Sequence, residues 1–270
     1  MKQTAIIIPC YNEAERLDQS KIMTYLKNTP DVSFVFVNDG STDGTSQVID
    51  RLKKEHPLQI HALDLCHNSG KAEAVRQGIL KAIPMSFSYI GYWDADLSTP
   101  LDTINDFCEL LDQNQAHTVI GSRVKLLGRN IEREKTRHYL GRIFATFASM
   151  ILKLPIYDTQ CGAKLFKNST DLKQVFSSPF KVNWAFDIEM IARYKLITEL
   201  RNGPEMRTAI IEHPLDEWVH KQGSKVKGFD FIKAPMELIK LFVILYVPHV
   251  SAIYRKTVLK GVSNNTILKK

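Results

Sequence analysis

Residues 88–97 form the sequence Ser-Tyr-Ile-Gly-Tyr-Trp-Asp-Ala-Asp-Leu, an apolar run that ends in two aspartates, Asp94 and Asp96. The run predicts a buried strand, and open α/β sheets bind ligands at the carboxyl ends of their strands. A buried carboxylate without a partner is costly. A hard cation such as Mg²⁺ or Mn²⁺ is a suitable partner, because it takes carboxylate oxygens together with substrate phosphates. Taken alone, the two aspartates fit a solvated strand end equally well.

Further strands and helices alternate on both sides of this run. Apolar segments predict strands at residues 4–9, 32–37, 58–65 and 117–121, and helices are expected at 13–27, from about 42, at 70–83 and after residue 100. Strands that alternate with helices of this length predict an α/β fold with one doubly wound, mostly parallel sheet flanked by helices.

The second half of the chain has a weaker pattern. The polar residues 125–138 predict a mobile loop, and the apolar positions that follow share one helical face. Residues 158–166 predict a loop and a short strand, and residues 184–196 a further helix. This half therefore adds fewer predicted strands to the sheet.

The chain is basic and of moderate length. Its 270 residues are 44% hydrophobic, and 36 Lys and Arg against 29 Asp and Glu give a net charge of +7. Such a chain can form one large domain, or one domain with an appendage. The charge suits an anionic substrate or an anionic membrane surface, and we expect no nucleic-acid partner.

Polar residues follow each of the first four predicted strands. They occupy residues 9–13, 38–45, 68–71 and 94–96. A carboxylate such as Asp39 can accept hydrogen bonds from a nucleoside, and Lys71 at a helix start can meet a phosphate. Each segment is ordinary by itself, but their convergence on one sheet edge predicts a site for a nucleotide diphosphate.

The residues that carry this chemistry resemble a known family. Residues 7–13 (Ile-Ile-Pro-Cys-Tyr-Asn-Glu), 37–45 (Val-Asn-Asp-Gly-Ser-Thr-Asp-Gly-Thr) and 93–96 (Trp-Asp-Ala-Asp) are similar to the signatures of the family 2 inverting glycosyltransferases. Within that family the likeness is to dolichyl- or polyprenyl-phosphate glucosyl- and mannosyltransferases, and it extends over about residues 3–247. This narrower likeness rests on residues 121–123, 158–166, 186–189 and 223–226.

The resemblance implies a glycosyltransferase-A fold, a nucleotide-sugar donor and a dication, Mg²⁺ or Mn²⁺. By the family pattern the following residues bind the donor: Pro9, Tyr11, Glu13 and Asp39 at the nucleoside, Lys71 at the diphosphate, and Asp94, Ala95 and Asp96 at the metal and sugar. Asp94 and Asp96 are the expected metal ligands. The segment Gly70-Lys71-Ala72-Glu73 lacks the second glycine expected after the lysine.

The acceptor side has three arginines and two aspartates as candidates. Arg123 follows the fifth predicted strand, and Arg137 and Arg142 flank the start of a predicted apolar helix. A guanidinium fork suits a lipid phosphate, and Arg123 is the preferred arginine. A sugar hydroxyl would need a carboxylate base, for which Asp187 and Asp158 are candidates, with Glu189 as a further one. A phosphate acceptor needs no base, because it is already largely ionised at neutral pH. Asp187 then serves only to orient the acceptor or an arginine.

The C-terminal part has two interpretations. Residues 229–247 predict a very apolar helix, which either packs on the sheet or lies in a membrane interface beside the basic tail. We therefore divide the chain into a catalytic domain, residues 1–228, and a C-terminal element, residues 229–270. We expect a cytoplasmic protein attached peripherally to the inner face of the membrane.

The resulting hypothesis is an inverting, metal-dependent transfer of a hexose from a nucleotide diphosphate to a polyprenyl or dolichyl phosphate. Glucose and UDP are the preferred sugar and nucleotide. Two alternatives stay open at this stage. One is transfer to a saccharide hydroxyl in polysaccharide or lipopolysaccharide assembly, and the other is a non-catalytic nucleotide-sugar-binding protein.

Overall fold

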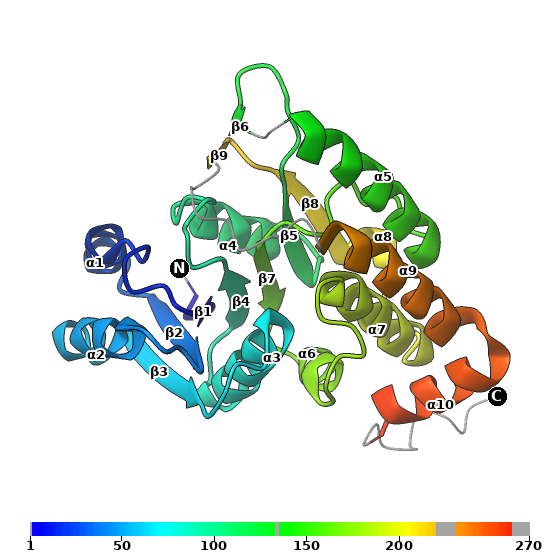
Figure 1. The fold of residues 1–270 in the computed structure, drawn as a ribbon, viewed down its shortest axis with the longest axis horizontal. Coiled ribbons are helices and arrows are strands. Elements are labelled where there is room, and N and C mark those ends of the chain that lie inside the picture. The colour runs from blue at the N-terminus through cyan, green and yellow to red at the C-terminus, as the bar shows by residue number, and fades with distance from the viewer. Residues whose placement is uncertain (1, 133–134, 220–229, 261–270) are drawn as a thin grey trace.

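A seven-stranded sheet organises the computed structural model, which describes residues 2–132, 135–219 and 230–260, with side chains except at 135–140 and 230–232 (Figure 1). The strand order is β3-β2-β1-β4-β7-β5-β8. The strands are β1 (Thr4–Cys10), β2 (Val32–Asp39), β3 (Ile60–Leu65), β4 (Tyr89–Trp93), β5 (Thr118–Ser122), β7 (Ala163–Lys167) and β8 (Ile210–Pro214). Only β7 runs against its neighbours, β4 and β5. The predicted mostly parallel sheet is therefore confirmed.

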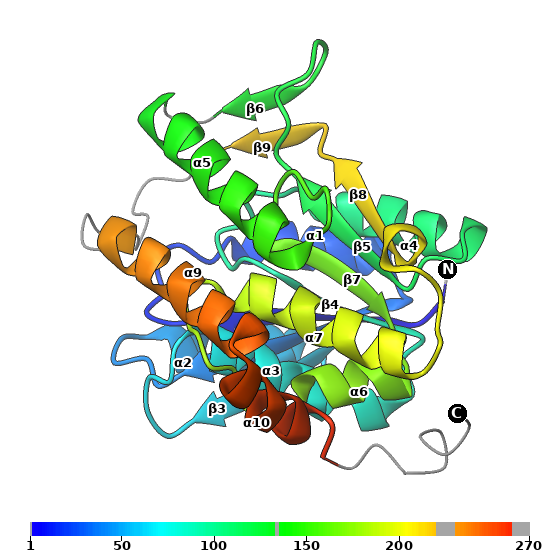
Figure 2. The same cartoon turned by 90° about the vertical axis from the view of Figure 1, so that its right-hand side faces the viewer.

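Helices cover both faces of this sheet (Figures 1 and 2). They are α1 (Gln19–Asn28), α2 (Thr45–Glu55), α3 (Lys71–Ala82), α4 (Thr103–Gln113), α5 (Lys135–Leu152), α6 (Thr170–Phe176), α7 (Phe186–Leu200), α8 (Met206–Ala209), α9 (Asp230–Tyr246) and α10 (Pro248–Val258), with a 3₁₀ turn at Ile83–Met85. Successive strand residues point to opposite faces. Ile7 and Val35 therefore pack with α3, α6 and α7, whereas Ile6 and Phe34 pack with α1, α2 and α4.

Two predicted boundaries were wrong. The first helix begins at Gln19 rather than residue 13, because Asp18 caps it by accepting a hydrogen bond from the Lys21 amide at 3.1 Å. The polar segment 125–138 is only partly a loop. It contains β6 (Asn130–Glu132), which pairs in parallel with β9 (Glu217–Val219), and the first residues of α5.

The C-terminal helices pack on the body of the protein. Leu238 and Leu241 of α9, and Tyr254 and Val258 of α10, belong to the same buried cluster as α3 and α7. No helix of the described ranges is by itself long and apolar enough to cross a membrane. The segments Lys233–Tyr246 and Pro248–Val258 reach that length and composition only together, with an 87° bend between them. The division at residue 229 stays a prediction.

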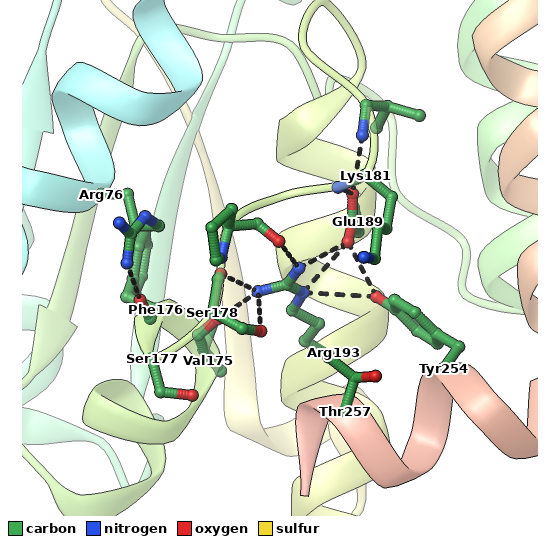
Figure 3. Close-up of polar contacts among 12 residues, drawn as sticks. Arg76, Val175, Phe176, Ser177, Ser178, Lys181, Glu189, Arg193, Tyr254 and Thr257 are labelled. Carbon is green, nitrogen blue, oxygen red and sulfur yellow. Dashed lines mark hydrogen bonds and ion pairs between the residues drawn. The ribbon is translucent and has the colours of Figure 1, made fainter. Parts of the chain in front are cut away.

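A buried ion pair within α7 is hydrogen-bonded to a tyrosine of α10 (Figure 3). Arg193 donates to Glu189 at 2.7 Å, and its guanidinium also donates to the carbonyls of Val175 and Ser178. The Tyr254 hydroxyl, from α10, donates to the same Glu189 oxygen at 3.0 Å. Glu189 therefore anchors the framework, and its fully buried carboxylate is a poor candidate for a catalytic base.

Candidate active site

Asp94 and Asp96 lie at the carboxyl end of β4, and a cation from another segment faces each of them. The Lys71 ammonium, at the start of α3, is 2.5 Å from Asp94 Oδ1. The Arg16 guanidinium is 3.7 Å from Asp96 Oδ2, and Asp96 Oδ1 accepts the Ser98 amide at 3.0 Å. The aspartate side chains are 40% and 27% exposed. Both carboxylates are therefore partly open to solvent, and both are electrostatically compensated.

Gly162 is required for the position of Asp94. The Asp94 amide donates to the Gly162 carbonyl at 3.0 Å, so the backbone just before β7 touches the end of β4. A Cβ atom on Gly162 would lie 1.8 Å from Asp94 Oδ2. Any side chain at residue 162 would therefore displace the aspartate from Lys71.

Arg16 is a site residue that the sequence did not reveal. Its guanidinium is 3.4 Å from the carboxylate of Glu13 and also reaches Asp96, so it links the end of β1 to the end of β4. The Glu13 amide donates to Thr45 Oγ1 at 2.8 Å, which fixes the turn after β1. Arg16 can reach Asp96 because it lies in this turn, before α1 begins.

Asp39 lies at the end of β2 and organises the start of α3. Its two carboxylate oxygens accept the amides of Ser69 at 2.7 Å and of Gly70 at 2.8 Å. Gly40 follows with φ +61°, and a Cβ there would lie 2.4 Å from the His67 carbonyl carbon. Asp39 thus places Lys71 at the sheet edge, and its contact with a nucleoside stays a prediction.

The other predicted donor residues lie at the same edge. Pro9 belongs to β1, Tyr11 follows it directly, and both are half-buried. Ala95 is buried between the two aspartates. The structure therefore brings all the predicted donor residues to the ends of β1, β2 and β4 and the start of α3.

The charge of Lys71 is stabilised by the carboxylates around it. Burial disfavours the charged ammonium of Lys71, but Asp94, Asp187 and Asp96 outweigh it and raise the pKa of Lys71 above its usual value. Lys71 is therefore a permanent cation at neutral pH, as a diphosphate ligand needs.

Asp187 lies in the first turn of α7 and forms a buried ion pair. Lys164, from β7, is 2.5 Å from Asp187 Oδ1, and the two side chains are 0% and 5% exposed. The Tyr92 hydroxyl donates to the same oxygen, and burial together with the Asp187 charge raises the pKa of Tyr92 well above its usual value. Lys164 also donates to the Cys161 carbonyl at 2.6 Å. These contacts leave Asp187 poorly suited to act as a free base, and its orienting role toward the acceptor or an arginine stays a prediction.

Arg123 and Asp158 form a bidentate pair beside this group. Arg123 Nε and Nη2 donate to the two Asp158 oxygens at 2.7 and 2.8 Å. Glu212 of β8 in turn accepts the backbone amides of Tyr157 and Asp158. Burial disfavours the guanidinium charge, but Asp158 and, more weakly, Asp94 raise the pKa of Arg123. Asp158 therefore orients Arg123, a partnership that the sequence did not indicate.

The structure describes the other two arginine candidates, Arg142 and Arg137, less completely. Arg142 donates to the Tyr157 carbonyl at 3.3 Å and stacks on the Tyr157 ring. The side chain of Arg137 and residues 223–226 lie outside the part of the chain that is described.

Comparison with known proteins decides the family. The sequence profile of glycosyl transferase family 2 matches residues 5–173, from β1 into α6. The chain belongs to this family. The match contains the first three signatures, of which the third holds the aspartate pair, so the family assignment made from the sequence is confirmed.

Curated relatives in family 2 align over most of the chain. The dolichyl-phosphate beta-glucosyltransferase of Dictyostelium discoideum is 30% identical over 83% of this chain and 69% of its own length. The corresponding protein of Saccharomyces cerevisiae is 29% identical over 93% of this chain and 76% of its own length.

Solved structures of other enzymes have the same fold. Glucosyl-3-phosphoglycerate synthase of Mycobacterium tuberculosis, solved in complex with UDP, superposes with a TM-score of 0.62 and 14% identity. It covers 90% of this chain, which covers 79% of that structure. A complex of the same enzyme with Mn²⁺, UDP-glucose and phosphoglyceric acid gives a TM-score of 0.60. The glycosyltransferase-A-like fold is confirmed.

Proposed function

We propose that this family 2 glycosyltransferase moves glucose from UDP-glucose to a polyprenyl or dolichyl phosphate, with inversion at the anomeric carbon. One observation carries the proposal. Lys71 and Arg16 face the aspartate pair at the edge of the sheet, and Arg123 is held by Asp158 beside them. The names of the curated relatives support glucose and the lipid phosphate, and the UDP complexes of the structural neighbours support the nucleotide.

The two aspartates fit a hard dication whose coordination shell is completed by the substrate. In the described ranges no group of three or more His, Cys, Asp or Glu side chains could hold a metal ion. Asp94 and Asp96 would therefore contribute two oxygens, and the diphosphate and water the others, which is how Mg²⁺ is commonly held. The bound ion would neutralise charge on the departing diphosphate. Mn²⁺ in the neighbouring complexes supports a dication of this class.

Lys71 and Arg16 supply the remaining positive charge for the donor. Each now faces a carboxylate, so a diphosphate that enters between them gains two preorganised cations. Lys71 stabilises the leaving diphosphate as negative charge develops on it. Asp39 and Glu13 keep both cations in place through the start of α3 and the turn after β1.

The acceptor side is built for an anion. Arg123 donates from Nε and Nη2 to Asp158. Its Nη1 group carries further N–H donors, which can bind an anion. A lipid phosphate held there arrives ionised, and no proton has to be removed. The ion pair of Asp187 with Lys164 agrees with this, and it argues against a saccharide hydroxyl that needs a free base.

The surface of α5 and α9 supports peripheral contact with a membrane. The two helices lie side by side (Figure 2). Six large apolar side chains there, called here the apolar face, are each more than half exposed: Ile143, Phe147, Met150, Met236, Ile239 and Phe242. Apolar area of this kind lies well in a bilayer interface. The opposite side of α9 is buried, so the helix packs on the body of the protein while its apolar face stays available for a membrane. Attachment to the inner face of the membrane stays a prediction.

The test is transfer of radiolabel from UDP-glucose to dolichyl phosphate in detergent, measured by extraction into organic solvent. We expect label in the organic phase with Mn²⁺ or Mg²⁺ and none with EDTA. Asp96→Asn should lose at least about a hundredfold in rate, as for the loss of other electrostatic stabilisers. The control Asp50→Asn removes an exposed carboxylate of α2 and should leave the rate unchanged. Full activity in EDTA, or transfer only to a saccharide, would contradict the proposal.

A further inference from the structure

A cavity separate from the sheet edge lies where α5, α7, α9 and α10 meet. It has a volume of about 300 Å³, and its lining comes from the end of α5, the second half of α7, the end of α9 and the first turns of α10. The helix α7 links the cavity to the catalytic edge, because its first turn contains Asp187. Lys195 lines the cavity eight residues further on, or roughly 12 Å along the helix at 1.5 Å per residue.

The cavity is positively charged. Among the described residues, Lys153, Lys195 and Arg255 line it, against a single acidic residue, Glu199. Glu199 is 58% exposed and its carboxylate is 3.9 Å from the Lys195 ammonium, so it neutralises little of this charge. Lys195 donates to the Leu152 carbonyl at 3.0 Å, which aligns the ammonium and uses one of its three donors. Lys153 and Arg255 are exposed.

The walls of the cavity are apolar. Leu152, Leu196 and Ile244 are buried, and Leu245 is partly buried in the same cluster. Tyr246 also lines the cavity, and its hydroxyl donates to the Ile151 carbonyl. A ligand that satisfies both the walls and the charges has an anionic head and an apolar body.

The cavity opens beside apolar residues that would meet a membrane. On α9, Phe242 of the apolar face is followed by Val243 and Tyr246, and Val247 comes directly after the helix. All are more than a third exposed, and this row reaches the cavity at Tyr246. The chain then bends by 87° into α10, which brings Arg255 to the cavity. A lipid whose chain lies along this row can place its phosphate among the three cations.

We propose that this cavity is a second lipid site, which binds the phosphate head of an anionic phospholipid and is distinct from the acceptor site. The idea rests on the membrane contact proposed above. A free phosphate ion would meet the same three cations. It differs from the lipid because it gains nothing from the apolar walls of the cavity. Occupation by a bilayer lipid would fix the bend between α9 and α10 at the membrane surface.

The experiment measures binding of dihexanoyl phosphatidic acid by calorimetry, below the concentration at which it forms micelles. We expect saturable binding that weakens at least about tenfold in the double variant Lys153→Gln/Arg255→Gln, since bonds to charged groups are the strong ones. The matched control Lys173→Gln/Lys256→Gln loses the same charge outside the cavity and should bind as the unaltered protein does. Dihexanoyl phosphatidylcholine, with equal chains and no net charge, should bind weakly.

Three results would overturn the proposal: absence of binding, equal weakening in both double variants, or inorganic phosphate binding as tightly as the lipid. Transfer to dolichyl phosphate in detergent provides an independent readout. Lys153→Gln/Arg255→Gln should retain it, and its loss would identify the cavity as the acceptor site instead. Because the soluble lipid needs no membrane and the transfer assay needs no cavity, failure of this proposal is distinguishable from failure of the proposed function.

Discussion

Replacement of Lys164 by Met should destabilise the protein strongly, although it removes only one charge. Lys164 and Asp187 are 0% and 5% exposed, and their charged atoms are 2.5 Å apart. Lys164→Met leaves the Asp187 carboxylate buried, with the Tyr92 hydroxyl as its remaining side-chain donor among the described contacts. An uncompensated buried charge of this kind costs about 3–5 kcal/mol.

The size of the effect can be set against an exposed pair. For a domain of about this length, 1 kcal/mol shifts Tm by roughly 2–4 °C, so Lys164→Met should lower Tm by roughly 6–20 °C. Lys21→Met makes the same substitution at a side chain that is 60% exposed and 3.8 Å from Asp18. Loss of such a surface pair costs less than about 1 kcal/mol.

A double-mutant cycle separates the charge from the packing. Asp187→Asn alone leaves Lys164 buried as a cation, and should destabilise about as much as Lys164→Met. The double variant Lys164→Met/Asp187→Asn has no buried charge and keeps an acceptor for Tyr92, so it should be more stable than either single variant. Calorimetry or urea titration gives the three values. A Tm of Lys164→Met equal to that of Lys21→Met, or strictly additive losses, would refute the role assigned to the pair.

Three further results are expected. Asp39→Ala should weaken nucleoside diphosphate binding by roughly 1.5–3 kcal/mol. It should also lower Tm, because the amides of Ser69 and Gly70 lose their acceptor. Unchanged calorimetric affinity would reject the nucleoside role of Asp39. Phe147→Asp/Phe242→Asp should abolish flotation with anionic vesicles while the transfer rate in detergent is kept, and persistent flotation would remove the apolar face from the membrane contact. Burial lowers the pKa of His213, and Asp106 opposes this less strongly than burial acts while Arg129 adds to it. The unfolded chain therefore takes up protons first as the pH falls below about 6.5. Stability should therefore fall with pH below that value, less steeply in His213→Gln, and equal slopes in urea titrations of the two proteins would contradict this.

The sequence predicted well which residues gather at the carboxyl edge of the sheet, because this depends only on the segment that directly follows each strand. Each of the first four parallel strands ends in a short polar segment, and parallel strands place their carboxyl ends together. Asp39, Lys71 and Asp94 could therefore be assigned to one region without any structure. The family signatures agree with this, since they consist of those same segments.

The pairing of charges could not be predicted in the same way. Lys164 meets Asp187, and Arg16 meets Asp96, across separations of many residues that leave no periodic trace in the sequence. The late start of α1 was missed, because Asp18 caps the helix and residues 13–17 precede it outside the helix. Short strands such as β6 and β9 have three residues each, too few for an alternating pattern to be visible.

The position of β7 has a consequence for synthesis of the chain. β7 lies between β4 and β5, and its Ala163 pairs with Trp93, so the two neighbours never touch directly. A nascent chain that ends at β5 therefore has a split sheet, with two apolar strand edges lacking their partner. The Asp94 amide at the end of β4 also lacks its acceptor until the Gly162 carbonyl has been synthesised. Ribosome-bound fragments shorter than about 170 residues should thus be aggregation-prone and dependent on chaperones, and donor binding should emerge only after β7 has left the ribosome.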